Sequence, residues 1–117
     1  MKSLSPEQIA ALKYRYRDFE YYSYDGTKIP SDPLTYRDPD GDTVLHMAAI
    51  ANDVEAVSWL LNVGLDPNAI GDMGQTPLHW AVTNKNKEMA DLLVSFGAKT
   101  DIVDEFGGRP DLYFFED

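Results

Sequence analysis

The two histidines of this chain, His46 and His79, are the side chains best suited to metal binding or proton transfer near neutral pH. They stand 33 residues apart in the sequence. Neither belongs to a Glu-x-x-His or His-x-x-x-His pattern, which would place two ligands on one face of a helix. The spacing therefore predicts no metal centre at either histidine.

The carboxylates are the next candidates for chemistry. Asp38, Asp40 and Asp42 alternate with Pro39 and Gly41, which resembles the start of a calcium loop. The twelve-residue pattern with a terminal glutamate is missing, so we expect a solvated turn here. Acid–base catalysis would need one carboxylate in an apolar pocket, and no pattern in the sequence indicates one.

Other catalytic groups are missing from the sequence. The chain has no cysteine, which excludes thiolate nucleophiles, cysteine-ligated metals and disulfides. It also has no glycine-rich phosphate loop and no serine in a nucleophile motif. We therefore expect no enzyme activity, no metal and no cofactor.

The charge of the chain is large and unevenly distributed. Its 117 residues include 20 acidic and 10 basic residues, for a net charge of −10. Residues 1–37 carry six basic and five acidic groups, whereas residues 38–117 carry four basic and fifteen acidic groups. Nucleic acids and anionic membranes would repel such a chain, so neither is an expected partner. The sequence contains no long apolar run or secretion signal, and we expect a cytoplasmic protein.

The first 37 residues are rich in tyrosine. Six of the seven tyrosines lie there, interleaved with Lys13, Arg15 and Arg17. Such a segment could stack single-stranded nucleic acid, but the overall charge opposes this. The rings either pack as a cap on the rest of the chain or join a protein interface.

An internal repeat organises the rest of the sequence. Shifting the chain by 33 residues aligns eight identical pairs in one register. The pairs are Gly41 and Gly74, Thr43 and Thr76, Leu45 and Leu78, His46 and His79, Ala48 and Ala81, Glu55 and Glu88, Leu60 and Leu93, and Gly64 and Gly97. Gly107 and Pro110 continue the register from Gly74 and Pro77, which indicates a third copy.

The repeated motif resembles that of a known family. The hexapeptide from Thr76 to Ala81, Thr-Pro-Leu-His-Trp-Ala, strongly resembles the ankyrin-repeat signature, and residues 43–48 resemble it with valine in place of proline. The resemblance covers residues 38–110. It implies an all-α repeat fold, an ankyrin solenoid of helix–turn–helix units with short β-hairpin-like turns. It also implies that each histidine orders its turn and first helix through hydrogen bonds.

We expect a single compact domain. Residues 1–37 would form an N-terminal capping helix and loop, followed by repeats at 38–70 and 71–103 and a partial repeat or cap at 104–117. Asp53 and Asn86 are predicted to cap the second helices of the two full repeats. These helices would span Val54–Asn62, with Val57, Leu60 and Leu61 buried, and Lys87–Ser95, with Ala90, Leu93 and Val94 buried.

The two ends must cover apolar faces that two full repeats leave open. Ser5-Pro6-Glu7-Gln8 is a capping box, and a helix is predicted from about Pro6 to Tyr21. Its apolar face would consist of Ile9, Leu12, Tyr16 and Phe19. Residues 23–37 are predicted to form a loop. At the other end, the covering side chains are expected to be Leu112, Phe114 and Phe115.

The resemblance also implies where a partner binds, because turn tips and first helices form a concave face in ankyrin repeats. The predicted partner-binding residues at the tips are Asp40, Asp42, Asp72, Met73, Gln75, Glu105 and Phe106, and those on the first helices are Met47, Ile50, Trp80, Thr83 and Asn84. Apolar side chains inside a charged rim are typical of interfaces. For Trp80, packing against the neighbouring turn is an equal alternative.

These features predict a non-catalytic, monomeric protein-binding module. Its acidic face would attract a basic protein and speed association at low salt. Small stand-alone ankyrin-repeat proteins resemble bacterial proteins, and such repeats occur among immunity proteins. The sharpest hypothesis is therefore that the chain neutralises a basic toxin enzyme, such as a nuclease. The alternative is a regulatory adaptor that joins two proteins, and a hydrolase using acidic residues is a distant third.

Overall fold

The computed structural model describes residues 3–16, 21–22, 28–29 and 34–110. Their elements are α1 (Pro6–Arg15), β1 (Tyr21–Tyr22), β2 (Lys28–Ile29), α2 (Val44–Ile50), α3 (Val54–Asn62), the 3₁₀ turn η2 (Asp72–Gly74), α4 (Pro77–Thr83) and α5 (Lys87–Ser95). The all-α repeat fold predicted from the sequence is confirmed. Within the described ranges, no helix is both long enough and apolar enough to cross a membrane.

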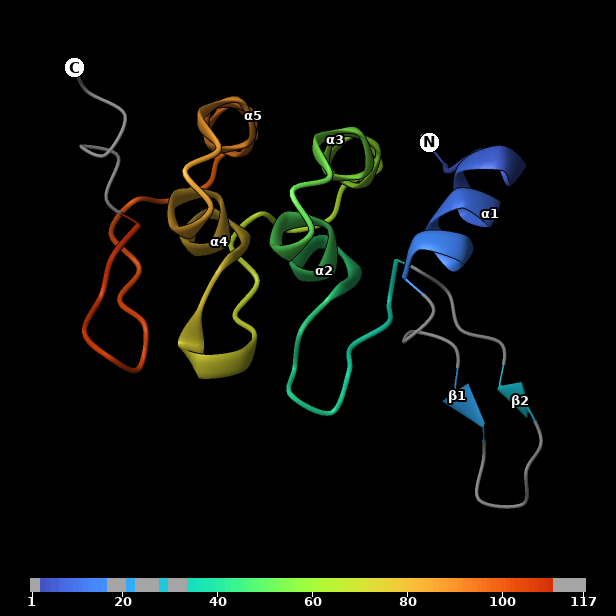
Figure 1. Ribbon diagram of the computed structural model, residues 1–117, viewed down its shortest axis with the longest axis horizontal. Coiled ribbons are helices and arrows are strands. Elements are labelled where there is room, and N and C mark those ends of the chain that lie inside the picture. Colours follow the sequence, from blue (N-terminus) through green and yellow to red (C-terminus); the bar gives the residue numbers. More distant parts are fainter. Residues whose placement is uncertain (1–2, 17–20, 23–27, 30–33, 111–117) are drawn as a thin grey trace.

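Two helical hairpins stack side by side (Figure 1). α2 and α4 form an inner row, and α3 and α5 form an outer row. Three turns, at residues 38–42, 71–75 and 104–108, project on one side of the inner row and are termed the tips. The short antiparallel pair β1–β2 lies on the same side, beyond the first tip.

Each inner helix starts at a capping box formed by a threonine and a histidine. At the start of α2, the backbone N–H of Thr43 donates to Nδ1 of His46 at 3.0 Å. At the start of α4, Thr76 donates to Nδ1 of His79 in the same way, at 2.9 Å. These local hydrogen bonds define where each inner helix begins and hold the tip that precedes it in place.

The outer helices begin where the sequence predicts. The Asp53 side chain accepts a hydrogen bond from the backbone N–H of Ala56 at 3.1 Å, and Asn86 accepts one from Met89 at 3.0 Å. Both side chains thus satisfy a helix N–H that has no intrahelical partner. The predicted bounds of α3 and α5 are confirmed.

The apolar core lies between the two rows of helices. Its buried side chains include Leu45, Ala48, Ala49, Val57, Leu60, Leu61, Leu78, Ala81, Ala90 and Leu93. The prediction of burial is wrong at Val94, which is 39% exposed. Its counterpart Leu61 is buried because α3 packs against α5, whereas residues 96–110 place no further helix beside α5.

α1 closes the N-terminal end of the stack, beside α3 (Figure 1). Leu12 is fully buried, and Ile9 and Tyr16 pack against the same core, as predicted. Phe19 was predicted to share this face and lies outside the described residues. The expected C-terminal covering residues also lie outside them, namely Leu112, Phe114 and Phe115.

The structure corrects the predicted end of α1. The helix ends at Arg15 rather than near Tyr21, because Tyr16 leaves the helical region at φ −127° and ψ 72°. Tyr21–Tyr22 pairs antiparallel with Lys28–Ile29, a segment predicted to be loop. Aromatic and β-branched residues favour extended backbone, but a two-residue strand is too short to produce a visible alternation.

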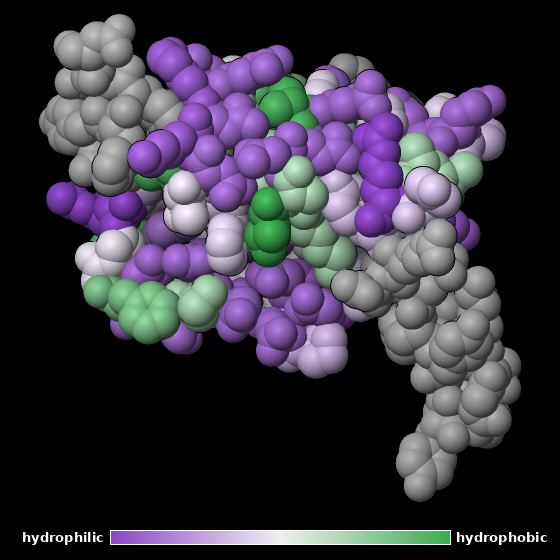
Figure 2. Space-filling view, viewed as in Figure 1, coloured by the Kyte–Doolittle hydropathy of each residue, from purple (hydrophilic) through white to green (hydrophobic). Residues whose placement is uncertain are grey.

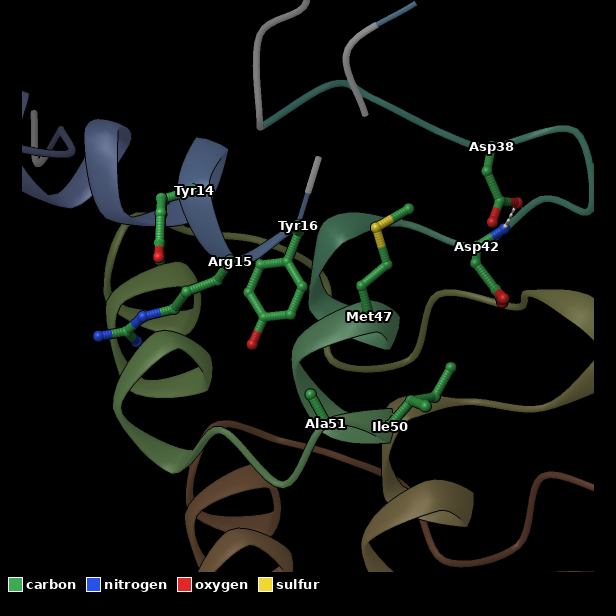
Figure 3. Close-up of a pocket in the computed structure, with 8 residues that line it drawn as sticks. All are labelled: Tyr14, Arg15, Tyr16, Asp38, Asp42, Met47, Ile50 and Ala51. Atoms are coloured by element: carbon green, nitrogen blue, oxygen red, sulfur yellow. Dashed lines mark hydrogen bonds between the residues drawn. The ribbon is translucent and has the colours of Figure 1, made fainter. Parts of the chain in front are cut away.

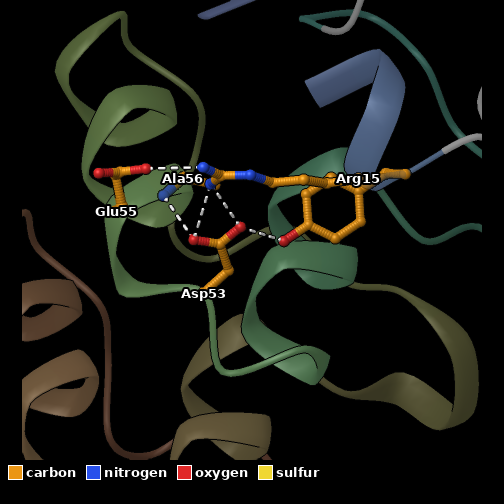
Figure 4. Close-up of polar contacts among 5 residues, drawn as sticks. Arg15, Asp53, Glu55 and Ala56 are labelled. Atoms are coloured by element: carbon orange, nitrogen blue, oxygen red, sulfur yellow. Dashed lines mark hydrogen bonds and ion pairs between the residues drawn. The ribbon is translucent and has the colours of Figure 1, made fainter. Parts of the chain in front are cut away.

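Arg15 and Tyr16 join α1 to the start of α3 (Figure 4). The Tyr16 hydroxyl donates to Oδ2 of Asp53 at 2.6 Å. The Arg15 guanidinium donates to Asp53 at 2.9 Å and to Glu55 at 2.8 Å. It also lies over the ring of Trp59, 5.1 Å from the ring centre. α1 is therefore held by polar contacts as well as by Leu12.

The ionisation of this cluster follows from its contacts. Burial alone would raise the pKa of Asp53, but hydrogen bonds from Tyr16, the Ala56 backbone and Arg15 outweigh it and lower that pKa. Burial and the bond to Asp53 raise the pKa of the Tyr16 phenol. At neutral pH the pair is therefore a neutral donor and a charged acceptor.

Removing the Tyr16 hydroxyl tests this docking. Tyr16→Phe keeps the ring and deletes the bond to Asp53, so we expect the free energy of unfolding to fall by about 1.5 kcal/mol, as for a bond to a charged group. Urea denaturation at pH 7 measures the change. In an Asp53→Asn background, the same substitution should cost less than about half as much. An equal cost in both backgrounds would show that the hydroxyl stabilises α1 without Asp53.

Candidate functional site

The two histidines lie at the junctions between successive repeats. Nε2 of His46 donates to the backbone carbonyl of Gln75 at 3.0 Å, and Nε2 of His79 donates to that of Gly108 at 3.3 Å. Both ring nitrogens of each histidine are therefore occupied, since Nδ1 accepts the capping bond. Among the described residues, no three His, Cys, Asp or Glu side chains are placed to hold a metal ion.

Burial keeps His46 neutral. It lowers the pKa of the imidazole, while the nearby Asp42 carboxylate acts in the opposite direction. A neutral ring with its proton on Nε2 satisfies both bonds, because Nδ1 must accept and Nε2 must donate. This tautomer makes His46 a fixed bridge between two repeats.

Asp38 shapes the first tip from inside. Its Oδ1 accepts hydrogen bonds from the backbone N–H groups of Asp40 and Asp42, both at 2.9 Å. The equivalent Asp104 accepts the same two bonds in the third tip, at 2.9 and 2.8 Å. The bond from Gly108 is the main cause of the lowered pKa of Asp104. The acids that resemble a calcium loop thus form a hydrogen-bonded turn.

The second tip lacks this acid, because Gly71 stands where the other two tips have aspartate. The carboxylate of Asp42, from the preceding repeat, fills this space, but it accepts one backbone bond, from Asp72 at 2.9 Å, where Asp38 and Asp104 each accept two. A Cβ atom on Gly71 would collide with that carboxylate and would lie 2.8 Å from Nε2 of His46. Asp42 is accordingly 8% exposed, and burial raises its pKa.

The second tip also contains a residue with a strained backbone conformation. The backbone N–H of Gln75 donates to the carbonyl of Asp72 at 3.1 Å, which closes η2 and places Met73 at φ 60° and ψ 20°. Side chains other than Gly, Asn and Asp rarely adopt this left-handed region. Asp40 and Phe106, at the same place in the other tips, do not adopt it. Among the three tips this conformation is therefore particular to Met73; outside them, Lys85 between α4 and α5 is also left-handed, at φ 55°.

The tips also carry carboxylates with no internal partner. The side chains of Asp40, Asp72 and Glu105 form no hydrogen bond or ion pair with the residues that the structure describes. Phe106, next to Glu105, is 74% exposed. The backbone N–H of Glu105 donates to the carbonyl of Met73 at 2.9 Å, which holds the second and third tips together. Met73 and Phe106 are thus neighbours along the row of tips.

The predicted residues of the inner helices differ in exposure. Ile50 is 41% exposed and Thr83 is also exposed, while Met47 and Trp80 are half-buried against the core. The indole N–H of Trp80 is buried and finds no hydrogen-bond partner in the described part of the chain. Figure 2 shows small apolar areas at the centre and at the lower left of a mainly hydrophilic surface.

Three of the predicted partner-binding residues are engaged within the protein instead. Asp42 completes the second tip, Gln75 donates to Asp104 at 3.2 Å, and Asn84 donates to the carbonyl of Ala49 at 3.1 Å. Each of these contacts links successive repeats. The other predicted residues form what we term the candidate face: Asp40, Met47, Ile50, Asp72, Met73, Trp80, Thr83, Glu105 and Phe106.

A groove that the sequence did not indicate adjoins the candidate face. It lies between α1 and α2, and its lining includes Tyr14 and Tyr16 together with Met47 and Ile50 (Figure 3). The two tyrosines reach this place because α1 docks on the first repeat. The tyrosine-rich composition of residues 1–37 was the available signal, but it carried no information on where the rings lie.

Comparison with known proteins agrees with this architecture. The family model described as "Ankyrin repeats (3 copies)" matches residues 9–104. A putative ankyrin repeat protein of fowlpox virus is 36% identical over 76 residues, which make up 65% of this chain and 13% of that protein.

Two further relatives match a comparable share of the chain. The human transient receptor potential cation channel subfamily A member 1 is 38% identical over 66 residues, 56% of this chain and 6% of that protein. A palmitoyltransferase, ZDHHC17 of Danio rerio, is 36% identical over 74 residues, 61% of this chain and 12% of that protein. The chain therefore spans 13% or less of the length of these relatives.

Gly71→Asp tests whether Asp42 replaces the missing tip acid. The new carboxylate would meet that of Asp42, so we expect the free energy of unfolding to fall by about 2 kcal/mol. Adding Asp42→Gln gives this junction the glutamine and aspartate that the next junction has at Gln75 and Asp104. The double variant should therefore recover most of the lost free energy of unfolding. Urea denaturation of the wild type, both single variants and the double variant measures the coupling. If the changes in the free energy of unfolding of the two single variants simply add in the double variant, Asp42 does not occupy the place of the missing tip acid.

Met73→Asn tests the strain in the second tip. Asparagine tolerates the left-handed region, so we expect the free energy of unfolding to rise by about 1 kcal/mol. Phe106→Asn is the matched control, because it makes a similar change in a tip without a left-handed residue at that place, and it should give no gain. Thermal and urea unfolding measure both. Equal changes in the two variants would show that Met73 is not strained.

Proposed function

The chain belongs to the ankyrin-repeat family, and from this premise we propose that it binds a basic protein through the candidate face and has no catalytic activity of its own. The observation that carries the proposal is the strained Met73, next to the exposed Phe106 and to carboxylates without an internal partner. Strained residues concentrate at functional sites, where the strained geometry serves a role other than folding.

The expected charge of the partner follows from the carboxylates at the tips. Asp40, Asp72 and Glu105 recur at successive tips, so their fields add over one side of the molecule. Repeats stack about 10 Å apart, which is close to the screening length in physiological salt. A cationic surface is attracted to such a row, and its rate of association rises as salt is lowered.

The apolar members of the face supply the affinity. Phe106 is 74% exposed, and the flexible side chain of Met73 can adapt to the shape of a partner. Apolar anchors surrounded by charge are the arrangement in which a few residues dominate binding. Ile50 and Thr83 extend this surface onto the inner helices.

We also propose that binding neutralises the partner. A nuclease uses cationic groups to hold its substrate, and an acidic face docked on those groups would exclude the nucleic acid. The sign of the charge and its place at the tips support this proposal. Inhibition of the partner in the complex is its direct test, since a partner with undiminished activity would contradict it.

An adaptor is the second candidate function. The observation that favours it is another exposed apolar pair, Ile70 at 48% and Val103 at 56% exposure, which occupy the same place in successive repeats. A second protein bound there would leave the tips accessible. Simultaneous binding of two proteins, measured by analytical ultracentrifugation, would favour the adaptor over the inhibitor.

Charge reversal at the tips tests the proposed function. The partner is the basic protein cross-linked to the domain in native extract and then purified. Combining Asp40→Lys, Asp72→Lys and Glu105→Lys should weaken its binding about a hundredfold at 50 mM salt, measured by calorimetry. The matched control combines Glu88→Lys, Asp91→Lys and Asp101→Lys, which change the net charge equally at exposed positions away from the tips.

The control variant should weaken binding less than about fivefold, because those charges are screened from the tips. Met73→Asn should weaken binding about tenfold although it stabilises the fold. Equal losses in the two charge variants would mean that net charge matters and the tips do not. An acidic partner, or affinity unchanged between about 50 and 500 mM salt, would contradict the proposal.

A further inference from the structure

A groove of about 570 Å³ lies between α1 and α2, at the N-terminal end of the candidate face. Met47 and Ile50 of α2 and Ala51, the residue after α2, line one side, and Tyr16 stands at the end of α1 (Figure 3). Asp38 stands at the end of the groove that adjoins the first tip. The groove thus has a mixed lining, with apolar side chains along α2 and a carboxylate at one end.

The groove is particular to the first junction. In the next repeat Trp80 stands at the place of Met47, and Asn84 stands at the place of Ala51. The Asn84 amide bonds to the carbonyl of Ala49 and so ties α4 to α2. Ala51, at the same place after α2, has no amide that could bond back to α1. The space that the second repeat fills with Trp80 and Asn84 is left open beside α2.

The charge around the groove favours a cation. Arg15 is the basic residue among those that line it, but its guanidinium turns to Asp53 and Glu55 and lies over a ring on α3. Asp38 uses Oδ1 to accept two backbone bonds, while its Oδ2 accepts none from the described residues. One carboxylate oxygen of Asp38 therefore remains for a ligand, while the neighbouring Arg37 guanidinium donates to the backbone carbonyls of Gly41 and Ile70.

We propose that this groove receives an arginine or lysine side chain of the partner polypeptide, with its alkyl stem along Met47 and Ile50 and its charged end at Asp38. The inference rests on the proposed function, which supplies the partner. Long cationic side chains lay their stems on apolar surface and keep the charged end in a polar place, and the groove offers both. The partner chain then continues over the first tip towards Asp40.

Methionine methyl signals report on the groove and the tips separately. The chain has four methionines, of which Met47 lines the groove, Met73 lies in the second tip and Met89 is fully buried. The probe is the tripeptide acetyl-Leu-Arg-Leu-amide, titrated into the full chain labelled with ¹³C at its methionine methyl groups. We expect a saturable shift of the Met47 signal with a Kd of about 1 mM and no shift at Met89.

Two controls isolate the charge and the shape. The same peptide with citrulline, a neutral isostere of arginine, should bind at least about tenfold more weakly. Ala51→Phe fills the groove and should weaken binding of the arginine peptide about tenfold, whereas Thr100→Phe adds the same ring at an exposed position after α5 and should not. Asp38→Asn keeps the turn acceptor and removes the charge, so arginine and citrulline peptides should bind it equally.

The outcomes separate this inference from the proposed function. A shift of the Met73 signal without a shift of the Met47 signal would show that the peptide binds at the tips and not in the groove. This outcome would contradict the inference about the groove but not the proposed candidate face. Equal binding of the arginine and citrulline peptides to the wild type would show that the groove does not require a positive charge. Equal binding of free arginine amide would show that the ligand need not be part of a polypeptide chain. If the Met47 signal shifts as expected but the partner binds the variant with reversed tip charges as tightly as the wild type, the proposed function is contradicted and the groove is not.

Discussion

A neutral imidazole that bonds to the backbone of the next repeat is the interaction on which the remaining structure depends. A helical hairpin of this length cannot bury its own apolar face, so it must be stacked on a neighbour. The half-buried carbonyls of Gln75 and Gly108 each accept a backbone bond within their own tip, and Nε2 of His46 and of His79 adds the bond that comes from the preceding repeat. The same rings cap their own helices, so one tautomer fixes the helix start, the tip and the spacing between repeats.

That constraint divides the acids of the chain into two groups. Asp38, Asp42 and Asp104 face inward and act as acceptors for backbone N–H groups in the tips. Asp40, Asp72 and Glu105 remain without internal partners on the outside of the same turns. Part of the net charge of −10 therefore comes from acids that stabilise the tips, and part comes from acids on the surface. Our proposals assign the second group and the remaining carboxylate oxygen of Asp38 to a partner, and composition alone cannot separate these acids from the others.

Local chemistry made much of this fold predictable. The bounds of α3 and α5 follow from Asp53 and Asn86, whose caps act within four residues. The end of α1 and the pairing of β1 with β2 were not predictable, because weak propensities there are decided by packing. Val94 was placed in the core by register, although register does not say whether a further helix follows.

The candidate site was predictable at the level of the tips and less so at the level of single residues. The contact of Asp42 with the second tip joins residues about 30 positions apart, so no local pattern reports it, and no local pattern reports the left-handed Met73 in the same tip. The groove beside α2 depends on how α1 docks. Sequence periodicity locates equivalent positions, but contacts across repeats decide which of them face outward.

Hydrogen–deuterium exchange on the complex tests the central claim most directly. The account predicts that the partner slows exchange at residues 38–42, 71–75 and 104–108 and along the exposed side of α2 and α4. Exchange in α3 and α5 should remain as in the free protein. Slower exchange concentrated in α3 and α5, with the tips unchanged, would show that the partner binds the outer helices and would contradict the account.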